Sequence, residues 1–188
     1  MKDYFKDSAV LDSDCYVADY TKSTGSRKGV VISLEPFPDI DFFHLKKRNK
    51  GQSIPYLAVN LEEYSNFIVG TENCECLFSS LKDDGRSWIL FLETKYCSPD
   101  NIERYAFKAH SQMKETLLKL ESMGLVNRAK KRIYFAYSVP GQDERSPFGN
   151  FAISQNETLT QLKAEGIQLL PYNTVVIATP EYLFRPVK

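Results

Sequence analysis

Hydrophobic positions along the chain change their spacing several times, and each spacing predicts a different kind of element. Alternating or continuous apolar residues in 56–70, 74–81, 87–97 and 131–139 are typical of β-strands, and a shorter apolar run follows in 173–180. Between the second and third of these runs, the pair Asp84-Gly85 favours a tight hairpin turn. We therefore expect consecutive antiparallel strands near the middle of the chain.

The spacing becomes helical after residue 98. Apolar side chains recur there about every 3.6 residues, and Gly124 follows as a stop signal. The stripe consists of Ile102, Tyr105, Ala106, Ala109, Met113, Leu117 and Leu120. A second helix is predicted over 156–166, and a short one with a basic C-terminal end over 39–50. The order helix, three strands, helix, strand, helix, strand predicts an α/β (α+β) fold with a mixed central sheet flanked by helices.

The length and composition of the chain predict one globular domain over residues 1–188. At 43% hydrophobic residues the chain can bury a substantial core, and no internal repeat or Gly/Ser/Pro-rich linker divides it. No apolar run approaches the ~20 residues that span a bilayer, and the N-terminus lacks the apolar core of a signal peptide. We expect a cytoplasmic protein without a membrane partner, whose four cysteines are reduced.

The charge balance excludes a global attraction to polyanions. The chain has 24 basic and 24 acidic residues, so any nucleic acid has to be bound by local patches. Two basic runs are candidates, although such runs most often only face water. They comprise Lys46, Lys47 and Arg48, and Lys130, Lys131 and Arg132.

One group of polar residues interrupts the predicted strands. Alternate residues of a strand share a face, so Glu93 and Lys95 project together from the end of the apolar run 88–92. A hairpin can bring Glu75 beside Glu93, and Gln112 on the predicted helix can face the same sheet edge. Hard divalent cations such as Mg²⁺ prefer carboxylate oxygens, and a nearby lysine stabilises charge on a phosphate. The group therefore favours phosphodiester hydrolysis.

Two other interpretations of these segments stay open. Glu93 and Lys95 could form an ordinary ion pair on a solvent-facing sheet, although the adjoining apolar run favours burial on both faces. A zinc site could instead be formed by Cys74, Cys76, Cys97 and His110. However, a C-x-C spacing in a strand points both thiols the same way, which favours small buried hydrophobic side chains.

The order of these motifs resembles the PD-(D/E)xK nuclease superfamily, which has the restriction-endonuclease-like fold. The matching segments are "NCECLF" around Glu75, "LFLETKY" around Glu93 and Lys95, and "AFKAHSQMKETL" around Gln112. With the strand "RIYFAYSV" they span about residues 60–140, which would form an αβββαβ core. The chain departs from the family pattern at the first acid, where Glu75 replaces the usual Asp, and at Cys74, which replaces the Pro of the motif name.

The resemblance implies a Mg²⁺- or Mn²⁺-dependent nuclease acting on nucleic acid, with DNA before RNA, in restriction, repair or phage defence. Glu75 and Glu93, with the carbonyl of Thr94, would hold the metal. Lys95 would position or activate the attacking water, and Gln112 would orient it. The alternative is a catalytically inactive module of the same fold that acts as a nucleic-acid-binding or protein-interaction scaffold.

Three further expectations concern the surroundings of the site. Glu62 and Glu63 could supply an additional acid from the chain upstream, and Tyr96 could touch the substrate. Because one site cannot cut both strands of a duplex in a single visit, we also expect a homodimer with closed two-fold symmetry.

Overall fold

The computed structural model describes residues 1–21, 29–64, 73–82, 84–142 and 156–186, which form two β-sheets. The six-stranded sheet contains, in spatial order, β1 (Ala9–Leu11), β5 (Tyr56–Asn60), β6 (Cys76–Ser80), β7 (Ser87–Thr94), β8 (Lys131–Ser138) and β9 (Ile167–Leu170). The five-stranded sheet contains β11 (Leu183–Phe184), β10 (Thr174–Ile177), β4 (Phe43–Lys47), β2 (Cys15–Asp19) and β3 (Val30–Ser33). The general α+β class is therefore as predicted.

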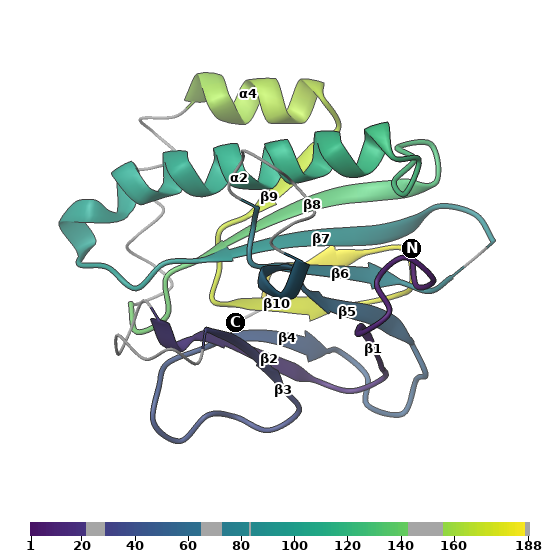
Figure 1. The fold of residues 1–188 in the computed structure, drawn as a ribbon, viewed down its shortest axis with the longest axis horizontal. Helices are drawn as coiled ribbons and strands as arrows, with labels where there is room; N and C mark the ends of the chain where they lie inside the picture. The colour runs from purple at the N-terminus through teal and green to yellow at the C-terminus, as the bar shows by residue number, and fades with distance from the viewer. Residues whose placement is uncertain (22–28, 65–72, 83, 143–155, 187–188) are drawn as a thin grey trace.

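The two sheets and the helices form three layers (Figure 1). Helix α2 (Ile102–Ser122) runs across one face of the six-stranded sheet, with α4 (Asn156–Ala164) beside it. The five-stranded sheet packs against the opposite face. The prediction of a sheet flanked by helices is thus met on one face, whereas the other face is covered by a second sheet that the sequence patterns did not predict.

Strand β7 is central to this arrangement, and all eight of its residues are buried. It pairs antiparallel with β6 and parallel with β8, and the crossover to β8 passes through α2. Phe91 faces the core beneath α2, whereas Leu92 faces the core between the two sheets. Burial on both faces explains why this segment reads as a continuous apolar run.

The elements next to the site match their predicted positions closely. Gly85, in the β6–β7 turn, has a φ of 72°, a conformation that glycine adopts without a steric cost. Helix α2 ends one residue before Met123, and Gly124 follows with a φ of 71°. The buried stripe of α2 is as predicted except at two positions: Tyr105 is 37% exposed, and the polar Thr116 is fully buried.

Two segments differ from the prediction. Residues 39–50 do not form a helix, because Phe43 and Leu45 are buried in alternation and β4 is inserted between β2 and β10. The basic residues that suggested a helix C-terminus instead end a strand. The strand predicted over 56–70 stops at Asn60, where the 3₁₀ turn η1 (Leu61–Tyr64) begins, and positions 65–70 lie outside the described residues.

A buried lysine links the turn between β1 and β2 to β4. The ammonium of Lys47, which is only 4% exposed, donates to the Asp12 carboxylate at 2.6 Å. Ser53 and the backbone N–H of Ile54 donate to the same carboxylate at 2.6 and 2.8 Å. These contacts, the Lys47 hydrogen bond first, lower the pKa of Asp12 from 3.8 to about 2.

We expect Asp12→Asn to lower the free energy of unfolding at pH 7 by about 1 kcal/mol, because the carboxylate is partly exposed and its ion pair is screened. The folded pKa lies below the unfolded value, so the stabilisation is complete above about pH 5 and is lost as the pH falls through about 2. Urea denaturation at pH 7 and pH 2.5 measures this, with exposed Asp3→Asn as the control. A deficit of the same size at both pH values would contradict the prediction.

Candidate active site

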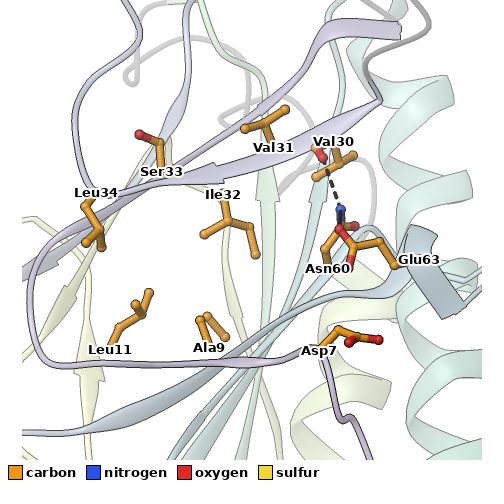
Figure 2. A pocket seen from close by; sticks show the side chains of 11 residues that line it. Asp7, Ala9, Leu11, Val30, Val31, Ile32, Ser33, Leu34, Asn60 and Glu63 are labelled. Carbon is orange, nitrogen blue, oxygen red and sulfur yellow. Dashed lines mark hydrogen bonds between the residues drawn. The ribbon is translucent and has the colours of Figure 1, made fainter.

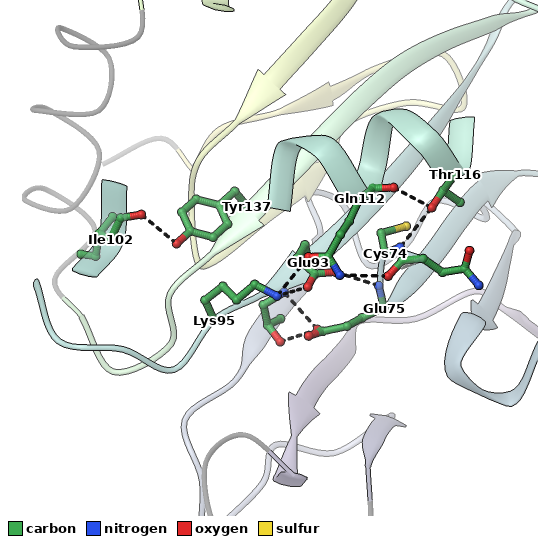
Figure 3. Close-up of polar contacts among 10 residues, drawn as sticks. Cys74, Glu75, Glu93, Lys95, Ile102, Gln112, Thr116 and Tyr137 are labelled. Carbon is green, nitrogen blue, oxygen red and sulfur yellow. Dashed lines mark hydrogen bonds and ion pairs between the residues drawn. The ribbon is translucent and has the colours of Figure 1, made fainter. Parts of the chain in front are cut away.

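Two acids, a lysine and a glutamine meet at the C-terminal end of β7 (Figure 3). Glu93 belongs to β7 and Lys95 follows it, while Glu75 lies in the bend immediately before β6. Gln112 projects from α2 above them. Of the predicted catalytic group, the structure therefore brings together all four members, from two strand ends and one helix.

The two carboxylates are joined through the backbone. The N–H of Glu75 donates to Oε2 of Glu93 at 3.1 Å. Oε2 of Glu75 in turn accepts the N–H of Thr94 at 3.0 Å and also the Thr94 hydroxyl. Thr94 therefore positions the Glu75 carboxylate through its N–H and side chain, a role in addition to the predicted contact of its carbonyl with metal.

Lys95 and Gln112 complete the group. The Lys95 ammonium donates to Oε1 of Glu93 and lies 3.4 Å from Oε1 of Gln112. The Gln112 amide also donates to the carbonyl of Asn73 at 3.2 Å, one residue before Cys74. Gln112 thus spans the gap between Lys95 and the chain that leads into Glu75.

Thr116, which the helical stripe did not include, anchors this chain to α2. Its hydroxyl donates to the carbonyl of Gln112 at 2.8 Å and accepts the N–H of Cys74 at 3.0 Å. A buried backbone N–H without a partner is costly, so Thr116 stabilises the bend that carries Glu75. A polar residue inside an otherwise apolar helical stripe is the sequence signal for such a role.

The site concentrates charge in a dry environment. Glu75, Glu93 and Lys95 are 3%, 0% and 5% exposed, and two carboxylates with one ammonium sum to a formal charge of −1. Burial, followed by the charge of Glu93, raises the pKa of the Cys74 thiol well above its usual range. The group is therefore a buried cluster with a negative formal charge next to a neutral thiol, and an additional cation would stabilise it.

The cysteines do not face one side as predicted. Cys74 packs into the core beneath α2, whereas Cys76 packs into the core between the sheets, because the bend at Glu75 breaks the strand alternation. Within the residues that the structure describes, no three His, Cys, Asp or Glu side chains gather into a metal-binding group. The zinc interpretation therefore has no assembled ligand set there.

The two glutamates provide the type of ligand that Mg²⁺ prefers. Mg²⁺ is usually bound through one or two carboxylates, with waters and substrate phosphates as the other ligands, so it does not need three protein acids. Each ionised carboxylate offers about four lone-pair sites, so a glutamate can accept hydrogen bonds and bind a cation at the same time. Glu75 and Glu93, adjacent and net negative, fit this requirement.

A cavity of about 260 Å³ opens beside the site. It is lined by Lys95, Tyr96, Tyr105 and Lys108. Tyr105 and Lys108 were not predicted as site residues, although Tyr105, Lys108 and Gln112 follow one another on one helix face at successive spacings of three and four. This spacing is the signal that could have found them. Tyr96 was predicted to touch substrate, and it lines this cavity.

Tyr96 also connects the site to the second sheet. Its hydroxyl donates to the carbonyl of Asp41 at 2.7 Å and accepts the N–H of Asp19 at 3.4 Å. Asp19, at the end of β2, is fully buried. Burial raises the pKa of the Tyr96 phenol, and the charges of Glu75 and Asp19 add to the effect. A second-sheet acid therefore lies in the electrostatic environment of the site, which strand patterns alone did not reveal.

The structure places the basic run 130–132 far from the two acids. Because Ser87 pairs with Lys131 and Glu93 with Tyr137 along parallel strands, Lys131 lies six residues, or about 20 Å, from the level of Glu93. Lys131 itself donates to Ser79, Ser80 and Ser87, and Arg132 stacks on Tyr182. These contacts give both side chains a structural role at the opposite end of the sheet.

The basic run 46–48 also lies away from the two acids. Lys47 is buried against Asp12, and Lys46 and Arg48 are exposed beside it at the C-terminal end of β4. The N-terminal side of β4, near Asp41, is the side that contacts Tyr96. Neither predicted phosphate-binding run therefore lies beside the carboxylates.

The upstream acids Glu62 and Glu63 follow Leu61, whose N–H donates to the carbonyl of Glu75 at 2.8 Å. Their carboxylates accept hydrogen bonds from β3 and β5. Glu62 accepts the N–H of Val30 at 2.9 Å, and Glu63 accepts the side-chain amide of Asn60 at 3.2 Å. Glu63 lines a cavity of about 490 Å³ between β1 and β3, whose middle is apolar (Figure 2). Among the described residues, those that line this cavity include no lysine or arginine.

In the described part of the chain, no helix is both long enough and apolar enough to cross a membrane. Comparison with protein-family models, with curated proteins and with solved structures finds no match to this chain. What the chain does is therefore inferred from the geometry of its own residues.

Proposed function

We propose that this protein is a Mg²⁺-dependent nuclease that hydrolyses phosphodiester bonds in nucleic acid. The observation that supports the proposal is the convergence of Glu75, Glu93, Lys95 and Gln112 from separate elements into one buried, net acidic group next to a cavity. A structural ion pair needs only Glu93 and Lys95. That simpler explanation accounts neither for the Glu75 carboxylate nor for the Gln112 amide.

In this proposal Glu75 and Glu93 hold the metal, with the carbonyl of Thr94 as a further ligand. When bound, Mg²⁺ supplies Lewis-acid polarisation of the phosphate and lowers the pKa of a coordinated water. Thr94 fixes the Glu75 carboxylate by two hydrogen bonds, so this group is oriented before substrate arrives. Mn²⁺ has the same preference for oxygen ligands.

The remaining residues act on the water and the phosphate. Lys95 lies between Glu93, Gln112 and the cavity, so its ammonium can hold the attacking water and offset negative charge that develops on the phosphate. Gln112 is fixed by its hydrogen bond to Asn73, and its amide oxygen can accept a hydrogen bond from that water. Both polar groups are supported by α2 and β7, which are rigid elements.

The fold of the site region supports the same proposal. β5, β6 and β7 form an antiparallel meander, α2 follows, and β8 returns parallel to β7. This order is compatible with the βββαβ part of the expected restriction-endonuclease-like core. The helix expected before it has no counterpart directly upstream, because β4 and the connection 48–55 occupy that position.

Removal of metal tests the proposal directly. We expect the purified protein to cleave single- or double-stranded DNA or RNA in Mg²⁺ or Mn²⁺ and to lose all cleavage in EDTA, because the glutamates need a cation to engage a phosphate. Cleavage of fluorescent substrates measures this, and calorimetry measures metal binding by wild type and Glu75→Gln. Undiminished cleavage in EDTA would overturn the metal assignment, and absence of cleavage under all these conditions would overturn the nuclease.

One set of observations favours a second candidate, the inactive nucleic-acid-binding or interaction scaffold. Both predicted basic runs lie away from the acids, and Lys131 is held by three serine oxygens. A scaffold would show no saturable Mg²⁺ binding that depends on Glu75. The homodimer expected from the sequence would serve only if a duplex is cut on both strands, and light scattering with and without duplex would measure it.

A further inference from the structure

The cavity beside Lys95 combines aromatic and cationic side chains. The described residues that line it are two tyrosines, Tyr96 and Tyr105, and two lysines, Lys95 and Lys108. Aromatic rings provide faces on which a base can stack, and ammonium groups attract a phosphate. The described residues that line the cavity between β1 and β3 include no lysine or arginine, so they do not provide this combination.

The positions of the lining residues show which end of the cavity borders the two acids. Lys95 also contacts Glu93, so one end of the cavity borders the two carboxylates. Tyr105 and Lys108 lie on α2, where they continue the face that carries Gln112. Tyr105 is 37% exposed although it falls in the apolar stripe of α2, so its ring is left at the cavity instead of in the core.

The size of the cavity limits what it can hold. At about 260 Å³ it lies just below the ~300–1,000 Å³ typical of sites for drug-sized ligands. Such a volume suits one unstacked nucleotide unit and is too small for a base pair. A base inside a duplex is stacked between its neighbours, so it would first have to leave the helix.

We propose that this cavity, lined by Lys95, Tyr96, Tyr105 and Lys108, is a subsite for one unpaired nucleotide next to the scissile phosphate. The base stacks on the tyrosines, and its phosphate lies near Lys95 and Lys108. The substrate class is therefore single-stranded nucleic acid, or a duplex end that frays, and not an intact duplex. The position next to a scissile phosphate rests on the proposed nuclease, whereas the binding of one nucleotide in this cavity does not.

Binding measured without metal tests the subsite apart from catalysis. The probe is a short fluorescein-labelled oligothymidylate in EDTA, with fluorescence anisotropy as the readout and the annealed duplex as a comparison. We expect Tyr105→Ala to weaken binding of the single strand about 5- to 150-fold, the range expected for loss of one stacked base. Tyr105→Phe keeps the ring and should bind like wild type.

Lys108 is tested by salt. Lys108→Gln should lower the slope of log affinity against log salt by about 0.7, the value for one lost phosphate contact on a single strand. The matched controls are exposed residues of α2 that do not line the cavity. Phe107→Ala controls for Tyr105→Ala, and Lys119→Gln controls for Lys108→Gln. Thermal unfolding by circular dichroism verifies that each variant is folded.

Each result has a distinct meaning. Loss of binding in Tyr105→Ala but not in Phe107→Ala, with a weaker duplex complex, supports the subsite. Any one of three results overturns it. These are equal affinity of Tyr105→Ala and wild type, complete displacement of the oligonucleotide by inorganic phosphate at the same concentration as its nucleotides, and no binding by wild type. If the protein cleaves in Mg²⁺ but Tyr105→Ala binds like wild type, only the subsite is overturned. If binding depends on Tyr105 but no cleavage occurs, only the proposed nuclease is overturned.

Discussion

Lys95→Met should reduce the Mg²⁺-dependent cleavage rate at least about 100-fold, the usual effect of removing one group that stabilises charge in a transition state. The methionine keeps most of the length of the side chain but carries no ammonium. The Lys95 ammonium contacts both Glu93 and Gln112, so its loss removes the group that would hold the water at that point. Single-turnover cleavage of a fluorescent substrate measures the rate.

The matched control is Lys119→Met, which removes an exposed ammonium from the same region of the molecule without touching the site. It should cleave within about twofold of wild type, since exposed substitutions away from such features change little. Circular dichroism must show that Lys95→Met is folded at the assay temperature. Cleavage by a folded Lys95→Met at the wild-type rate would remove Lys95 from the mechanism.

Glu93→Ala should lower the free energy of unfolding by about 3–5 kcal/mol, because it leaves the Lys95 ammonium buried without its carboxylate. It also removes the acceptor of the Glu75 N–H. The double variant Glu93→Leu/Lys95→Met replaces the charged pair by apolar side chains of similar volume. It should recover part of the loss, because no unpaired ammonium remains, although the Glu75 N–H still lacks its acceptor. Urea denaturation at pH 7 measures all three proteins.

A partly exposed ion pair gives the comparison. Lys114 on α2 lies 2.7 Å from Glu165, and both side chains are more than a quarter exposed. Glu165→Ala should therefore cost about 1 kcal/mol or less. If Glu93→Ala cost no more than Glu165→Ala, the Glu93–Lys95 pair would not be buried in the way described.

Together the two experiments separate function from stability at one site. A double variant that is as stable as wild type but does not cleave would show that the charged pair is kept in the core for chemistry. Buried ion pairs are weak contributors to stability compared with apolar side chains. A double variant that folds stably would therefore show that folding does not require the charged pair.

The local elements around the site follow from the sequence because their signals are local. The Asp84-Gly85 turn, the apolar run of β7 and the 3.6-residue stripe of α2 depend on backbone conformation and on one buried face each. Alternation along β7 also placed Glu93 and Lys95 on one face, and helical spacing placed Gln112 toward them. These residues could be predicted together because few residues separate them from a well-defined strand or helix.

The rest depended on partners that are distant in the chain. Residues 39–50 became β4 because β2 and β10, from the two ends of the chain, bracket this segment. The basic runs were separated from the acids by strand register, which moves a side chain about 3.3 Å per residue along the sheet. A sequence pattern identifies a charged run but not the strand end at which it will lie.

What the sequence by itself determined is therefore the set of strands and the helix that carry Glu93, Lys95 and Gln112, since backbone spacing decides which side chains share a face. Only the tertiary structure decided that Glu75 reaches Thr94 from a bend, that Tyr105 and Lys108 border a cavity, and that Asp19 approaches through Tyr96. These contacts join elements across two sheets and a helix. Their geometry is set by packing between layers, which no local periodicity contains.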